Sequence, residues 1–243
     1  MANQPEHIVK SYSDDLRRLR ELVARMGGLA ERQVADAAYV LTRRDATAAA
    51  EVAARDAPID GLEREVESFC VRLLALRAPM AADLRFIVAA MKISQELERI
   101  GDYARNVAKR VMVIAQQPNL VGLGTFEALS QLVQRNLKDV IDALLNEDAE
   151  ACRRVWASDV AVDDIYNGLF RQLLTHMMED PRNITSCTHL LFMAKNLERI
   201  GDHATNIAEN VWFLVQGDHP LPPRDKRDET STTNIPSGGF SQS

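Results

Sequence analysis

The sequence Leu-Glu-Arg-Ile-Gly-Asp occurs twice in the chain, at residues 97–102 and again at residues 197–202. Extended forward, the two copies read LERIGDYARNVAKRV and LERIGDHATNIAENV, and 10 of these 15 positions are identical at a constant offset of 100 residues. Self-similarity at a fixed spacing is the signature of a duplicated structural unit. We therefore predict a protein that is built from two related halves.

Helical periodicity runs through the part of the chain that precedes and contains the first copy. From about residue 8 to 44, apolar residues recur at spacings of three and four, which predicts one long helix. Asp45 is then expected to cap an alanine-rich second helix, and a third begins near Asp60. Pro79 ends the third helix, because proline disfavours the helical conformation of the residue before it. A long helix that carries the first copy of the motif follows.

The same features return in the second part of the chain. The break lies at residues 118–124, which read PNLVGLG. After it, Asp148 corresponds to Asp45 and Asp163 corresponds to Asp60, each at an offset of 103 residues. The second part is therefore expected to repeat the helices of the first.

These patterns predict an all-α protein of two tandem, sequence-related three-helix bundles. We place the first bundle at residues 1–118 and the second at residues 119–217. No segment combines alternating polar and apolar residues with turn chemistry, so no strand is expected. Residues 218–243 are rich in Pro, Asp, Ser, Thr and Gly and lose the apolar periodicity, which predicts a disordered tail.

Composition and charge narrow the class of protein. With 46% hydrophobic and 26% charged residues, the chain has an ordinary globular composition, and its net charge of -6 with no basic patch argues against a nucleic-acid partner. The charged N-terminus does not resemble a secretory signal, and no run of 18 apolar residues could span a membrane. We expect a cytoplasmic protein that meets a membrane only through partners. Its three widely separated cysteines are expected to be buried and reduced.

Each copy of the motif places two acids and an amide at spacings of four, so that all three project from one side of a helix. Like charges at this spacing repel each other, and a divalent cation would turn the repulsion into ligation, because hard cations bind carboxylate and amide oxygens. If the helices approach one another, Asp60 and Asp163 on the preceding helices would complete the shell of ligands. The three positions are Glu98, Asp102 and Asn106 in the first copy, and Glu198, Asp202 and Asn206 in the second.

Other interpretations of these residues stay open. The acids would be solvated and partly neutralised by Arg99 and Arg199, while Gly101 and Gly201 allow helices to pack closely and the two asparagines serve packing. An acidic surface would also attract a basic partner in a salt-sensitive way. The chain has no Glu-x-x-His pair of a di-iron bundle, no phosphate-binding glycine loop and no nucleophile with a recognisable base, which predicts a protein that is not an enzyme.

The duplicated motif, together with RAPMAADLR at residues 77–85 and MMEDPRNI at residues 177–184, closely resembles the PhoU family of phosphate-uptake regulators. The resemblance covers residues 5–216. It implies two three-helix bundles in a cytoplasmic protein that is usually a homodimer and that represses the phosphate-starvation response. It also implies an adaptor role between the ATPase of the Pst phosphate ABC transporter and a PhoR-type sensor histidine kinase. The alternative is a metal-independent helical accessory protein of another phosphate carrier.

The resemblance further implies multinuclear iron or zinc, or other divalent ions such as magnesium or manganese, at the duplicated acidic motifs. Extension to Asp60 and Asp163 is less direct, because Glu63 and its counterpart Tyr166 break the duplication there. The second half also lacks the Asp-Leu-Arg sequence of the first, so the two sites are not expected to bind equally. The positions that match the family motif are Glu98, Asp102, Glu198 and Asp202.

Overall fold

The computed structural model describes residues 4–55, 57–117, 123–217 and 220–223, together with Asp228 and Thr230. All secondary structure in this part of the chain is helical, so the all-α prediction is confirmed. The predicted disorder of residues 218–243 falls almost entirely outside the described residues and stays a prediction. The elements are α1 (Gln4–Arg43), α2 (Ala46–Ala53), α3 (Ala57–Arg77), α4 (Ala81–Ile114), α5 (Leu123–Asn146), α6 (Ala149–Glu179), the short 3-10 helix η1 (Pro181–Asn183) and α7 (Ile184–Gln216).

The helix starts that the duplication predicts are present in both halves. The Asp45 carboxylate accepts hydrogen bonds from the backbone N–H groups of Thr47 and Ala48, both at 3.0 Å, and thereby caps α2. Asp148 caps α6 in the same way by accepting from the Ala151 N–H at 3.0 Å. Side-chain acceptors at this position satisfy N–H groups that have no partner within the helix.

The halves differ at one helix boundary. Between α2 and α3 the first half has a break, whereas the corresponding part of the second half lies inside the continuous helix α6. Pro58 lies in the first turn of α3, where its missing N–H costs nothing. The residue 103 positions later is Ala161, which donates a normal helical hydrogen bond and so lets α6 continue.

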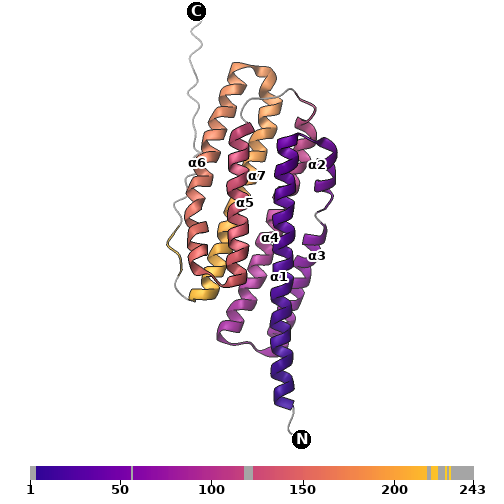
Figure 1. Ribbon diagram of the computed structural model, residues 1–243, viewed down its shortest axis with the longest axis vertical. Helices are drawn as coiled ribbons and strands as arrows, with labels where there is room; N and C mark the ends of the chain where they lie inside the picture. Colours follow the sequence, from indigo (N-terminus) through magenta and orange to yellow (C-terminus); the bar gives the residue numbers. More distant parts are fainter. Residues whose placement is uncertain are drawn as a thin grey trace, which may run out of the picture.

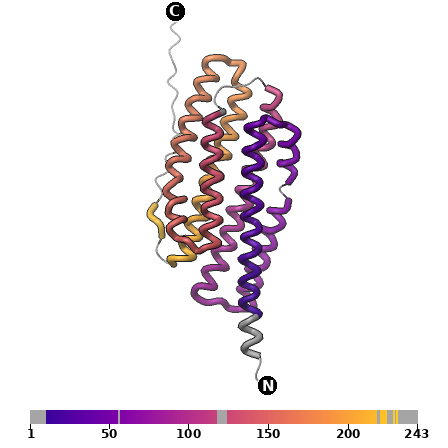
Figure 2. Tube along the Cα trace, viewed as in Figure 1, coloured from indigo at the N-terminus to yellow at the C-terminus, as the bar shows by residue number. Residues whose placement is uncertain are grey.

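The two helices that carry the motif form the centre of the molecule. The first half consists of α1–α4 and the second half of α5–α7. In Figure 1, α6 lies on one side of the molecule and α1, α2 and α3 lie on the other, with α4, α5 and α7 between them. Helix α4 packs against α7, and α1 packs against α5, so that the halves meet along two pairs of helices. Buried apolar side chains from all seven α-helices form one continuous core. The chain trace in Figure 2 shows the same arrangement.

Helices α4 and α7 run antiparallel and cross near the motif. The rings of Tyr103 and His203, which occupy equivalent positions of the two copies, stack with their centroids 5.4 Å apart. Further along, Arg110 of α4 lies 3.4 Å from the ring of His189 near the start of α7. A pseudo-twofold axis therefore passes close to the stacked pair. At the same level a Cβ added to Gly201 would lie 3.1 Å from Val162 of α6, so this glycine permits the close approach of α6 and α7.

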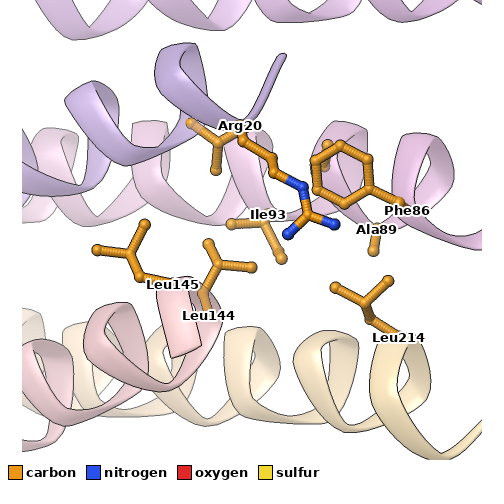
Figure 3. A pocket seen from close by; sticks show the side chains of 9 residues that line it. Arg20, Phe86, Ala89, Ile93, Leu144, Leu145 and Leu214 are labelled. Carbon is orange, nitrogen blue, oxygen red and sulfur yellow. The ribbon is translucent and has the colours of Figure 1, made fainter. Parts of the chain in front are cut away.

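A small apolar pocket lies where the halves meet, toward the start of α4 and the end of α7, and Figure 3 shows the Arg20 side chain in it, next to the Phe86 ring. The Arg20 guanidinium carbon lies 4.5 Å from the ring centroid, and its Nη1 donates to Glu147 in the turn between α5 and α6 at 2.7 Å. Arg20 thus links α1 of the first half to the second half. The pocket is lined by Arg20, Val23, Phe86, Ala89, Ala90, Ile93, Leu144, Leu145 and Leu214.

Candidate functional site

In the first half, α3 and α4 bring predicted acids to one open hollow. Asp60 and Glu63 come from consecutive turns of α3, and Glu98 faces them from α4. The sequence therefore placed Asp60 and Glu98 correctly on neighbouring helices, and Glu63 adds a third carboxylate. Asp102 lies one turn beyond Glu98. The full lining consists of Asp60, Glu63, Arg64, Gln95, Glu98 and Arg99.

The acids of this hollow make one another harder to ionise. The pKa of Glu98 is raised, first by burial and then by the negative charges of Asp102, Asp60 and Glu63. The pKa of Glu63 is raised as well, by burial and by neighbouring acids that include Asp60. Arg105 offsets part of this charge, because it forms an ion pair with Asp102 at 2.7 Å. Arg105 lies six residues beyond Arg99, the arginine that the sequence suggested as the neutralising residue.

The donor chemistry of the first hollow fits a hard divalent cation. Its lining offers carboxylate oxygens and the amide of Gln95, with neither histidine nor cysteine, and such oxygens suit magnesium, manganese or calcium better than zinc. Within the described ranges, no three His, Cys, Asp or Glu residues are gathered closely enough to ligate one ion. A bound cation would therefore draw the acids of α3 and α4 together. Asn106 is half-buried on α4, outside the lining of this hollow.

The second half has a corresponding hollow along α7, which is lined by a different set of side chains. It brings the predicted residues Glu198, Asp202 and Asn206 together, whereas Asp163 is buried on α6 outside the lining. The Lys195 ammonium donates to Glu198 Oε1 at 2.8 Å and to Asp228 Oδ2 at 2.7 Å. The lining consists of Lys195, Glu198, Arg199, Asp202, His203, Asn206 and Asp228.

Glu198 is the most deeply buried acid of the motif, with only 5% of its side chain exposed. Burial raises its pKa to about 7, although the hydrogen bond from Lys195 acts in the opposite direction. The second carboxylate oxygen, Oε2, is buried and has no hydrogen-bond partner among the residues that the structure describes. This carboxylate is thus half satisfied by a lysine, and the equivalent of that lysine in the first half is the neutral Gln95.

Contacts across the pseudo-twofold axis tie the motif helices together. Glu96 of α4 lies 2.5 Å from His203 Nδ1 and accepts a hydrogen bond from Asn206 Nδ2 at 3.0 Å. Burial acts to raise the pKa of Glu96, but the bonds from His203 and Asn206 leave it below its ordinary value. In the opposite direction, Arg199 Nη1 donates to the Tyr103 hydroxyl at 3.0 Å. Asn206 therefore joins the two halves, as the packing interpretation of the asparagines expects.

Sequence reasoning missed three residues of the second hollow and its surroundings, namely Glu96, Lys195 and Asp228. The first two break the duplication, since Glu96 corresponds to Asn196 and Lys195 to Gln95. A difference between otherwise identical copies was the available signal for them. Asp228 follows the last helix in a segment without periodicity, and its sequence gave no signal.

The fold and these hollows define a class of protein: a duplicated helical bundle with an acidic hollow beside each of two crossing motif helices. The PhoU domain model matches residues 23–111 and 126–211, and the chain belongs to the PhoU family. This is a family of accessory and regulatory proteins of phosphate transport that are not enzymes, as the sequence predicted.

Known relatives agree in sequence and in fold. The chain is 50% identical over 227 residues to a phosphate-specific transport system accessory protein PhoU homolog from Caulobacter vibrioides, covering 93% of this chain and 99% of the relative. The crystal structure of PhoU from Pseudomonas aeruginosa superposes with a TM-score of 0.83 at 39% identity, covering 85% of this chain and 99% of that one. The phosphate transport system regulatory protein PhoU from Streptococcus pneumoniae gives a TM-score of 0.80 at 25% identity, covering 87% and 100%. In the described part of the chain, no helix has the length and apolar character of a membrane span.

Proposed function

We propose that this protein is a cytoplasmic negative regulator of the phosphate-starvation response that also modulates phosphate uptake. It acts as an adaptor, in homodimeric form, between the ATPase of a Pst-type phosphate transporter and a PhoR-type sensor histidine kinase. The observation that carries the proposal is the 50% identity, over almost the whole of both chains, to a protein named as an accessory of phosphate-specific transport.

Exposed apolar side chains at the two hairpin tips support an adaptor with two contact surfaces. The turn between α3 and α4 exposes Leu76 and Met80, and 80% of Met80 is accessible to solvent. The turn between α6 and α7 similarly exposes Met178 and Ile184. Because α4 and α7 are antiparallel, the two tips lie at opposite ends of the molecule (Figure 1). Exposed apolar residues at such positions suit contacts with partner proteins.

Removal of the gene is expected to raise the output of a phosphate-starvation reporter several-fold in cells that grow with ample phosphate. Wild-type protein supplied in trans should restore repression, whereas a Met80→Glu, Met178→Glu variant should not, because a charge at each tip opposes apolar docking. Tyr39→Glu alters an exposed aromatic residue away from both tips and serves as the matched control. An unchanged reporter in the deletion strain would contradict the regulatory role and favour an accessory of another phosphate carrier.

We also propose that the first hollow binds a divalent cation through Asp60, Glu63, Glu98 and Asp102. The acids raise one another's pKa, and a cation would relieve that repulsion. The resemblance to the family suggests iron or zinc, while the all-oxygen lining favours magnesium or manganese.

Replacing Glu98 by Ala is expected to lower metal affinity by at least about tenfold. Mutation of a residue that only orients a metal ligand already lowers affinity by about tenfold or more, and loss of the ligand itself should have at least this effect. Elemental analysis and Mn²⁺ titration of protein purified without chelator would measure this. Asp139→Ala removes an exposed acid of α5 and is the control. Equal metal content in wild type and Glu98→Ala would exclude the site. If the acids instead attract a basic surface of a partner protein, that interaction should weaken as the salt concentration rises.

A further inference from the structure

We propose that the hollow of the second half binds the C-terminal segment of this same chain instead of a metal ion, with the Lys195 ammonium in the role of the cation. Asp228 is the residue of that segment that docks. The docking can be tested by proteolysis independently of the cation binding proposed for the first half, whereas a measurement of bound Mn²⁺ rests on that proposal.

The contacts of the Lys195 ammonium support the docking of Asp228. Its Nζ lies between two carboxylates from different parts of the chain, 2.8 Å from Glu198 and 2.7 Å from Asp228. The same ammonium lies 5.0 Å from the centre of the Tyr166 ring on α6. Charge-assisted hydrogen bonds of this length are among the strong ones, and a cation over an aromatic face adds further attraction. A divalent ion that entered here would meet the ammonium at contact distance.

Thr230 fixes the carboxylate of Asp228 from the other side. The Thr230 backbone N–H and hydroxyl both donate to Asp228 Oδ1, at 2.9 and 2.6 Å, while Oδ2 accepts from Lys195. The Thr230 side chain also lies close enough to the Tyr166 hydroxyl to act on its pKa, which it lowers against the larger effect of burial. Asp228 and Thr230 therefore contact both helices that flank the hollow, α7 through Lys195 and α6 through Tyr166.

Comparison of the two halves shows that this docking is specific to the second. Lys195 takes the place of Gln95, and Tyr166 takes the place of Glu63. Relative to the equivalent positions of the first half, these two substitutions remove an acid from the helix before the motif helix and add a cation to the motif helix itself. They also supply the two groups that Asp228 and Thr230 contact. The buried Glu198 would otherwise lack a counter-charge, which is costly for a carboxylate at that depth.

Trypsin cleavage next to Asp228 tests the docking directly. Arg224, Lys226 and Arg227 immediately precede Asp228 in the sequence, so a protease that cleaves after them must first release Asp228 from Lys195. Asp228→Asn is expected to raise the rate of cleavage at these sites several-fold in the full-length protein. Lys195→Arg keeps the cation and should retain most of the protection, and Asp164→Asn, an exposed acid on α6, should leave the rate unchanged. Equal rates for wild type and Asp228→Asn would overturn the proposal.

Counting bound Mn²⁺ by electron paramagnetic resonance tests the role of Lys195. Wild type is expected to bind Mn²⁺ at the first hollow alone, and a Lys195→Gln, Asp228→Asn variant, folded by circular dichroism, should gain a second site. Binding at both hollows in wild type, or at the first alone in the folded variant, would overturn the cation role of Lys195. If wild type binds no Mn²⁺ while Asp228→Asn still accelerates cleavage, the metal proposal for the first hollow fails and the docking stands. Should the double variant not fold, the cleavage rates of Asp228→Asn decide.

Discussion

Wild-type protein is expected to lose stability as the pH rises from about 4.5 to about 7, because of Glu198. The Glu198→Gln variant is expected not to show this loss. Burial raises the pKa of Glu198 in the folded protein to about 7, whereas the unfolded chain releases this proton near the ordinary value of 4.5. Between these values the folded state holds a proton that the unfolded state has lost, so the free energy of unfolding falls as the pH increases. With about 1.4 kcal/mol for each pH unit, the loss is on the order of 3 kcal/mol.

Urea unfolding of wild type and Glu198→Gln at several pH values between 4 and 8, in the presence of a chelator, measures this effect. The difference between the two proteins should change through the window and stay constant above pH 7, where Glu198 is ionised in both states. Asp164→Asn is the control, because this acid is exposed and its replacement should leave the curve parallel to wild type. Parallel curves for wild type and Glu198→Gln would show that Glu198 is ionised at ordinary acidic pH and that Lys195 outweighs its burial.

The features that sequence alone predicted well are those that local chemistry decides. Asp45 is predictable as a helix cap because a carboxylate before a helix satisfies backbone N–H groups within three residues, and Asp148, which corresponds to it at the offset of 103 residues, caps α6 in the same way. The spacing of apolar residues likewise indicated the long helices, and the constant offset between the copies indicated two related halves. Asp60 and Glu98 were expected to meet only if neighbouring helices approached, which the structure shows.

The parts that sequence did not predict depend on how the two halves meet. Asn206 binds Glu96 of the other half, a contact that follows from the antiparallel crossing of α4 and α7 and from no local pattern. The difference between Gln95 and Lys195 is visible in the sequence, but its consequence depends on Asp228 reaching the same hollow. Asp163 corresponds to Asp60 at the offset of 103 residues and was therefore expected near the acids of the second motif. It lies instead outside the lining of the second hollow.

Leu97→Ala and Leu197→Ala are expected to destabilise the protein by similar amounts, about 2 to 5 kcal/mol each, because both remove a fully enclosed side chain. These leucines open the two copies of the motif, and each is 1% exposed. Since the core is continuous across the halves, both variants should lower the midpoint of one shared unfolding transition. Leu76→Ala, at an exposed position of the α3–α4 tip, should change stability little and serves as the control.

Chemical denaturation followed by circular dichroism, and by fluorescence of Trp156 and Trp212 in the second half, distinguishes one cooperative unit from two. If the halves unfold together, Leu97→Ala shifts the tryptophan signal as much as Leu197→Ala does, although both tryptophans lie outside the first half. If they unfold separately, Leu97→Ala leaves the tryptophan transition in place and lowers only part of the helical signal. We expect the first result, because Arg20, the contact of Glu96 with His203 and Asn206, and the packing of α4 on α7 all join the halves. A regulator that must transmit a state from one end to the other benefits from this coupling, since a perturbation at one hairpin tip then changes the stability of the whole bundle.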